Sequence, residues 1–165
     1  MHKIIKLLDK IFRFSVARAH CDIPCGIYDP ITAQIAALTV VRMDDLIDEH
    51  HAQSKIQDKE FYNKLVRLIN VKEEHSEKVK HEIRVIFGDF IKGEHIEKFP
   101  ELPLLFHKIM QLGSADKQKS DRATAVELLE KVNRFAEIFW EIKGIKTKKA
   151  KAPYAPNLEF VYPEH

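Results

Sequence analysis

The sequence predicts an all-α fold in which four helices form an antiparallel four-helix bundle. Long stretches favour Leu, Ile, Lys, Glu and Ala, and the chain contains only five glycines. Apolar residues recur at helical spacing in four segments, and short breaks between the segments favour antiparallel neighbours. With 165 residues, 45% of them hydrophobic and 32% charged, the chain suffices for one domain with a modest core.

The first predicted helix runs from Asp29 to about His51. Asp29 is suited to cap its first turn, in which Pro30 is tolerated because the amide hydrogen it lacks has no partner there. A polar break at 53–57 ends the pattern, and the next helix is therefore expected to return beside the first.

The second predicted helix runs from Asp58 to about Phe90. The highly charged stretch from Lys72 to Lys78 is expected to include a solvated turn, since few apolar residues interrupt it. Gly93 then marks a loop.

The third predicted helix opens at Pro100, and Gly113-Ser114 is expected to stop it. Ser120 or Asp121 caps the fourth, which ends before Gly144.

Both ends of the chain lie outside the predicted bundle. Residues 1–19 are basic and amphipathic and are interpreted as a leader removed on maturation; a secretory signal, a transit peptide and an ordinary first helix are the alternatives. Charges interrupt this segment too often for a secretory core, so a cytoplasmic protein is expected, with an organelle as the alternative. Residues 145–165 are rich in lysine and then proline, which predicts an extended arm or a disordered end.

Charge and hydropathy exclude two classes of partner. The formal net charge is only +2, and no basic stripe is interleaved with aromatic residues, so no nucleic-acid partner is expected. No stretch of about 20 predominantly apolar residues occurs, which argues against stable membrane insertion.

The only cysteines, Cys21 and Cys25, follow His20 near the N-terminus. Two thiolates and an imidazole are competent ligands for zinc, copper or nickel. Spacing alone leaves a disulfide or two free thiols open. A closed zinc site lacks an obvious fourth side chain, whereas planar coordination through backbone nitrogen is typical of nickel or copper.

The whole run is more specific than the spacing. His20-Cys21-Asp22-Ile23-Pro24-Cys25-Gly26-Ile27-Tyr28-Asp29-Pro30 resembles the nickel hook, HCxxPCGxYxP, of nickel-containing superoxide dismutases. Phe99-Pro100-Glu101-Leu102 resembles the start of the family's third helix, and Ile138-Phe139-Trp140-Glu141 the end of its last helix. The resemblance covers roughly His20 to Lys143 and agrees with a four-helix bundle that carries an N-terminal metal-binding hook.

The resemblance implies a specific ligand set for one nickel ion per subunit. The ligands are the thiolates of Cys21 and Cys25, the backbone nitrogen of Cys21, and the amino group and axial imidazole of His20. Because that amino group is an amide nitrogen in the intact chain, a maturation protease must first cut between Ala19 and His20. Tyr28 and Asp22 are the implied catalytic residues, Tyr28 through its hydroxyl and Asp22 through its backbone amide.

The resemblance also implies activity and assembly. The reaction is the disproportionation of superoxide to oxygen and hydrogen peroxide, by a homohexamer of four-helix bundles. Two positions depart from the family pattern, because Ala36 and His75 stand where a carboxylate and a basic residue commonly support the axial imidazole. A nickel-binding module without turnover, and a structural bundle with a membrane-surface N-terminus, are the alternative functions.

Overall fold

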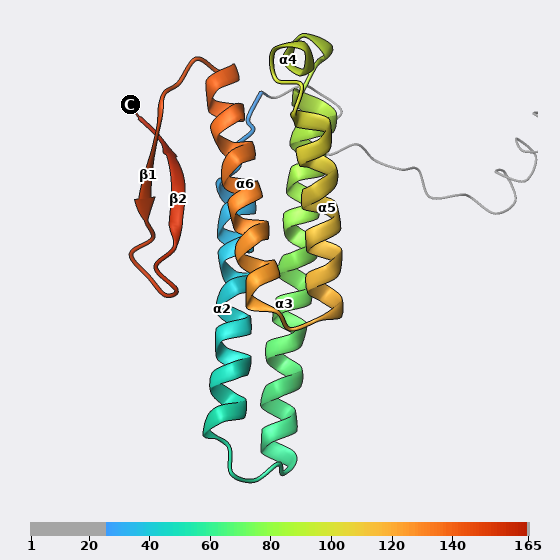
Figure 1. The fold of residues 1–165 in the computed structure, drawn as a ribbon, viewed down its shortest axis with the longest axis vertical. Helices are drawn as coiled ribbons and strands as arrows, with labels where there is room; N and C mark the ends of the chain where they lie inside the picture. Colours follow the sequence, from blue (N-terminus) through green and yellow to red (C-terminus); the bar gives the residue numbers. More distant parts are fainter. Residues whose placement is uncertain (1–25, 165) are drawn as a thin grey trace, which may run out of the picture.

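The computed structural model describes residues 26–164, and four long helices form its body (Figure 1). Helix α2 packs on α3 and α6, and α5 packs on the same two helices, which closes a square bundle. The predicted antiparallel four-helix bundle is therefore confirmed. The elements in chain order are α2 (Ile31–Gln53), α3 (Lys59–Val85), the π-helical turn η1 (Ile86–Phe90), α4 (Gly93–Lys98), α5 (Leu102–Gln118), α6 (Arg122–Ile142), β1 (Thr147–Lys151) and β2 (Glu159–Pro163).

Aspartates lie at three helix starts, two of them, Asp29 and Asp121, at positions predicted as caps. The carboxylate of Asp29 accepts the backbone N–H of Ile31 at 2.8 Å, and Pro30 lies directly before the helix. Asp58 accepts the N–H groups of Glu60 and Phe61, and Asp121 accepts that of Ala123. These bonds satisfy amide donors that have no partner within the helix.

Three local predictions are wrong. The stretch Lys72–Lys78 contains no turn, because α3 is continuous there and the side chains of Lys72 and Ser76 are buried. Gly93 does not mark a loop but begins the short helix α4. Helix α5 runs past Gly113-Ser114 to Gln118. Gly113 is a site of close packing on α3 and not a helix stop, because a Cβ there would lie 3.0 Å from Lys80 Cγ.

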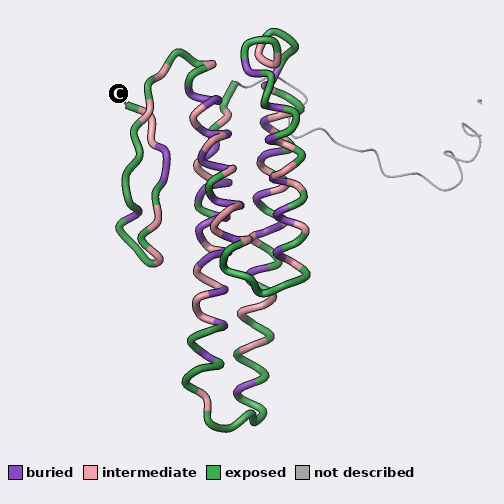
Figure 2. Tube along the Cα trace, viewed as in Figure 1, coloured by how far each residue is buried: buried purple, intermediate pink, exposed green. Residues whose placement is uncertain are grey.

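Burial follows the overlap of the four helices (Figure 2). The α2–α3 end extends beyond the connection between α5 and α6 and is mostly exposed. Between the overlapping parts lies one main apolar core, to which α3, α5 and α6 contribute large side chains, among them Ile83, Ile109, Leu128, Phe135 and Phe139.

Of the two alternatives predicted for 145–165, an extended arm or a disordered end, the described residues show two extended strands that pack on the bundle. Strands β1 and β2 pair antiparallel, with Lys149 opposite Val161. Phe160 and Val161 are buried in the main core. The side-chain amide of Asn133, on α6, donates to the carbonyl of Glu159 at 2.7 Å, and that of Gln34, on α2, donates to the carbonyl of Val161 at 3.2 Å. The two helices therefore supply donors to the β2 carbonyls that β1 does not pair.

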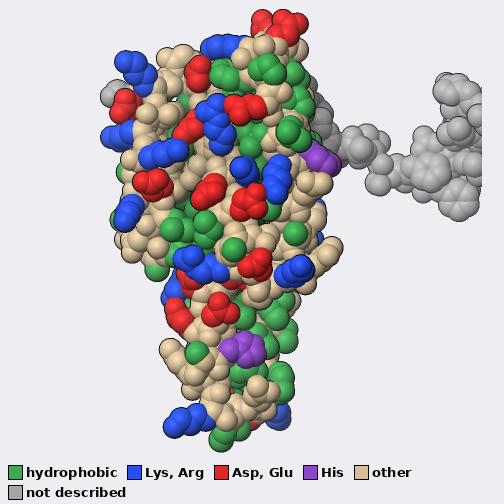
Figure 3. All heavy atoms as spheres, in the orientation of Figure 1, with side chains coloured by type: hydrophobic (Ala, Val, Ile, Leu, Met, Phe, Trp, Pro, Cys, Tyr) green, Lys and Arg blue, Asp and Glu red, His purple; other side chains and the backbone are tan. Residues whose placement is uncertain are grey.

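The surface carries charges of both signs. On the face in Figure 3, Lys and Arg side chains lie among Asp and Glu side chains and form no continuous basic area. Across residues 26–164, none of the helices combines the length and apolar character needed to cross a lipid bilayer.

Candidate metal centre

The predicted nickel ligands precede the part of the chain that the structure describes. His20, Cys21 and Cys25 lie outside the described residues, as does Asp22, so their positions remain predictions. Within residues 26–164, no three His, Cys, Asp or Glu side chains come together as a metal site. The ligands predicted from the sequence suit nickel chemically. Two thiolates and nitrogen donors favour a transition metal in planar coordination over magnesium or calcium, which prefer oxygen ligands.

Gly26 is the first described residue and directly follows Cys25. Its φ is +70°, a backbone conformation that residues with a side chain rarely adopt. No heavy atom of the described residues lies within 4 Å of the position a Cβ would occupy, so the backbone angle is the feature that favours glycine here.

Tyr28 joins the hook to the end of the bundle. Its half-buried ring lies 5.8 Å from the ring of Phe90, between centroids. Phe90 in turn lies 5.6 Å from the ring of His95 and 4.9 Å from that of Phe139. We call these four side chains, from the hook, η1, α4 and α6, the aromatic platform.

Lysines surround the aromatic platform. The ammonium of Lys143, just after α6, lies 5.5 Å from the centroid of Phe90 and 5.3 Å from that of Phe139. No carboxylate of residues 26–164 pairs with it. Lys92 holds η1 and α4 together, since its ammonium donates to the Asp89 carbonyl at 2.7 Å and its backbone N–H donates to Nδ1 of His95 at 3.0 Å. His95 therefore carries its proton on Nε2 when neutral.

The two positions that depart from the family pattern lie on α2 and α3. Ala36 is 0% exposed and packs in the main core. His75 lies within α3, where its Nδ1 donates to the carbonyl of Val71 at 2.8 Å. That bond leaves Nε2 of a neutral His75 as an acceptor.

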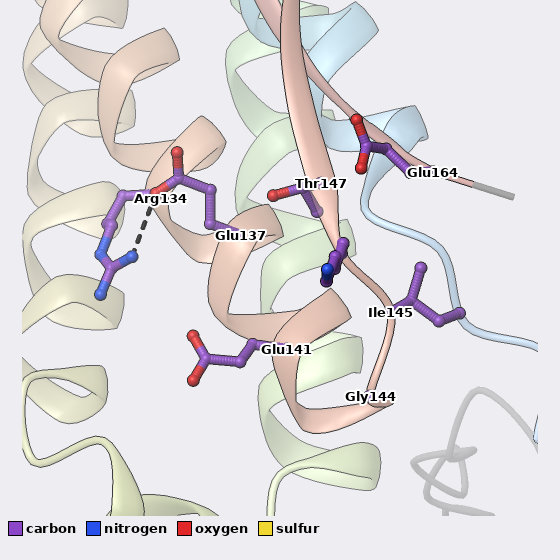
Figure 4. Close-up of a pocket in the computed structure, with 8 residues that line it drawn as sticks. Arg134, Glu137, Glu141, Gly144, Ile145, Thr147 and Glu164 are labelled. Atoms are coloured by element: carbon purple, nitrogen blue, oxygen red, sulfur yellow. Dashed lines mark hydrogen bonds and ion pairs between the residues drawn. The ribbon is translucent and has the colours of Figure 1, made fainter.

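An open groove of about 510 Å³ lies between the end of α6 and the hairpin (Figure 4). Two of its three carboxylates are engaged by cations: Glu137 contacts Arg134 at 3.0 Å and Lys149 at 2.9 Å, and Glu141 lies 3.7 Å from Lys98. The groove thus offers no cluster of uncommitted ligands, and the hook remains the candidate metal centre.

Sequence reasoning identified Tyr28 but missed Phe90 and Lys143 as its surroundings. These residues come from segments more than 50 positions apart in the chain. No periodic pattern joins them, and only the packing of η1 on α6 brings them together.

Comparison with known proteins gives a consistent result. The family model described as nickel-containing superoxide dismutase matches residues 15–143. A nickel superoxide dismutase of Streptomyces coelicolor is 34% identical over 141 residues, covering 83% of this chain and 98% of the relative. The corresponding protein of Streptomyces seoulensis is 33% identical over the same proportions.

Solved structures agree. A native nickel superoxide dismutase structure has a TM-score of 0.66 and 34% identity, covering 76% of this chain and 99% of that one. A nickel superoxide dismutase structure in the apo state has a TM-score of 0.63 and 32% identity, covering 72% and 99%. The family match ends at residue 143, before the hairpin.

Proposed function

The chain belongs to the nickel-containing superoxide dismutase family, and we propose that it disproportionates superoxide at a mononuclear nickel site, with one nickel per subunit. Two superoxide ions and two protons give one oxygen and one hydrogen peroxide. The observation that carries this proposal is the complete run from His20 to Pro30, which lies inside the matched region 15–143.

The hook supplies the donors. We assign the thiolates of Cys21 and Cys25, the backbone nitrogen of Cys21, and the amino group and imidazole of His20 as the ligands. Bound nickel supplies one-electron redox chemistry, and anionic sulfur and nitrogen donors favour its higher oxidation state. The thiolates are the groups most exposed to oxidation by the peroxide product.

The amino group of His20 requires processing of the chain. In the intact chain this nitrogen belongs to the Ala19–His20 peptide bond, and an amide nitrogen is a poor donor. Residues 1–19 are therefore a leader, and a protease that cuts after Ala19 is a necessary partner. Residues 20–144 are the functional unit, and the chain acts in the cytoplasm.

The described residues bear on how the anionic substrate approaches. Tyr28 holds the end of the hook against the bundle through its contact with Phe90, and its hydroxyl orders water or guides the small anion. The backbone amide of Asp22 lines the substrate pocket. Lys143 adds positive charge to the aromatic platform, which raises the local concentration of superoxide.

Self-association as a homohexamer completes the proposal. Ile27, inside the hook, is 82% exposed, and Leu104 on α5 is also largely exposed. A large apolar side chain beside a metal site gains by burial against another subunit. Light scattering on the processed protein tests this assembly, and a monomer contradicts it.

The decisive experiment combines intact mass, metal analysis and superoxide consumption. A chain that begins at His20 is expected to bind one nickel per subunit and to be active, whereas the uncleaved chain and Cys25→Ser are expected to lose both properties. The uncleaved chain is the matched control, because it retains every side chain of the hook.

Nickel binding by the processed chain without dismutation above the buffer rate would instead favour the nickel-binding module. Lipid association of an uncleaved, metal-free chain would favour the structural bundle.

A further inference from the structure

A cluster of charged and polar side chains lies inside the bundle, where α2, α3 and α5 meet the connection to α6. Asp44 of α2 is 1% exposed, Asp116 of α5 is 0% exposed, and Lys72 of α3 is 2% exposed. Ser76 and Ser120 complete the cluster. Burying such groups is costly unless every one has a partner.

Lys72 fixes the end of α5. Its ammonium donates to the backbone carbonyls of Asp116, at 2.6 Å, and of Lys119. It lies 3.5 Å from Oδ1 of Asp44 and 3.9 Å from Oδ2 of Asp116. One ammonium thus serves two carboxyl groups and also holds the α5–α6 connection.

Each carboxyl group has one satisfied oxygen. Ser120 donates to Oδ1 of Asp44 at 2.7 Å, and Ser76 donates to Oδ2 of Asp116 at 2.8 Å. The other oxygens, Oδ2 of Asp44 and Oδ1 of Asp116, are buried without a hydrogen-bond partner among the described residues.

Ionised carboxylates only accept hydrogen bonds, so these two oxygens cannot bond to each other while both groups are charged. With both ionised, two negative charges face one positive charge in the interior. A single added proton removes the excess charge and also supplies the missing donor.

We propose that the buried carboxyl group of Asp116, beside that of Asp44, is a proton-binding site that takes up one proton in weakly acidic solution and thereby tightens the α5–α6 connection on α2 and α3. The added proton makes Asp116 a donor toward the neighbouring carboxyl group of Asp44, and each group has one oxygen without a partner among the described residues. The site is separate from the nickel hook, and nothing in the dismutase proposal depends on it.

The electrostatics of the cluster support this site. Burial is the main cause that raises the pKa of Asp116 to about 6. The hydrogen bond from Ser76 and the charge of Lys72 lower this pKa, whereas the charge of Asp44 and a hydrogen bond with its carboxyl raise it. From α6, Ala125 packs nearby on the apolar side chains of Val40 and Val41.

The raised pKa fixes the sign of the pH effect. Between the ordinary carboxyl pKa of 3.8 and about 6, the folded chain holds a proton that the unfolded chain does not. The stabilisation from this site is therefore full in acid and is lost as the pH rises through about 6. Most paired carboxylates have the opposite dependence.

The test measures the folding equilibrium of the full chain by denaturant titration at pH 5 and pH 8, at one protein concentration. Asp116→Asn supplies a permanent donor toward Asp44 and keeps an acceptor for Ser76. Relative to this variant, the folding constant of the wild-type chain is expected to fall about tenfold from pH 5 to pH 8. Asp48→Asn, on the exposed side of α2, is the control and should retain the wild-type dependence.

Asp44→Asn gives a second, independent test, because it neutralises the other member of the pair. It is expected to show a weaker pH dependence than the wild-type chain, because the charge of Asp44 no longer raises the pKa of Asp116, and this holds even if Asp116→Asn does not fold. The double variant leaves Lys72 without a carboxylate and is expected to be less stable than either single variant at both pH values. The proposal would be overturned if the wild-type chain and both single variants showed the same pH dependence of folding. It would also be overturned if the double variant were as stable as the single variants.

Discussion

Lys143 illustrates how a single residue can combine packing with electrostatics. Its ammonium faces the rings of Phe90 and Phe139, and such cation–π contacts contribute about 0.5–1 kcal/mol at exposed sites. The contacts restrain a flexible side chain beside the ring partner of Tyr28. In the proposed function, this positive charge attracts the anionic substrate toward the aromatic platform.

Lys143→Met retains an unbranched side chain and removes the charge. We expect kcat/KM for superoxide to fall about threefold at low ionic strength, and the difference to disappear at high salt. Nickel content should not change. Lys148→Met, on β1 and away from the aromatic platform, is the matched control; an equal loss in both variants would show that only net charge matters.

Among the elements, the C-terminal hairpin depends on two amides for its docking. Gln34 donates to Asn133 Oδ1 at 2.8 Å and to the carbonyl of Val161, while Asn133 donates to the carbonyl of Glu159. One strand edge is therefore paired with helix side chains in place of a third strand. This arrangement explains why two polar residues are buried on α2 and α6.

Gln34→Ala leaves the Val161 carbonyl and the Asn133 oxygen without a donor in the interior. The free energy of unfolding is expected to fall by about 1–3 kcal/mol, as measured by denaturant titration. Gln111→Ala, at an exposed position of α5, should leave it nearly unchanged. Equal effects of the two changes would contradict the docking role of Gln34.

For the molecule as a whole, the hairpin is an addition to a bundle that is otherwise complete. The family match ends at residue 143, yet Phe160 and Val161 extend the main core. A large buried apolar side chain contributes about 1.5–3 kcal/mol. The hairpin therefore stabilises the bundle without supplying any of the assigned ligands.

Removal of residues 145–165 is expected to leave the helices intact and to lower the melting temperature by about 10 °C, because two large core side chains are lost. Circular dichroism during heating measures both properties. An unchanged melting temperature would show that the hairpin adds no stability, and loss of helicity at low temperature would show that the bundle needs it to fold.

The sequence by itself determined the four long helices and the hook. Helical spacing and caps such as Asp29 and Asp58 are local signals, because the atoms involved lie within one or two turns. The ligands proposed for the hook, from His20 to Cys25, are also neighbours in the chain, so their chemistry can be proposed before any fold is known.

The tertiary structure alone decided the features that join distant segments. Lys72 is buried and Gly113 lies inside a helix because α3 and α5 pack closely, which no local pattern reveals. The pairing of Asp44 with Asp116, the approach of Phe90 to Phe139, and the docking of the hairpin on Gln34 likewise join residues far apart in sequence. Burial and the pairing of buried polar groups depend on the whole fold, and therefore only the fold determines which of these side chains meet.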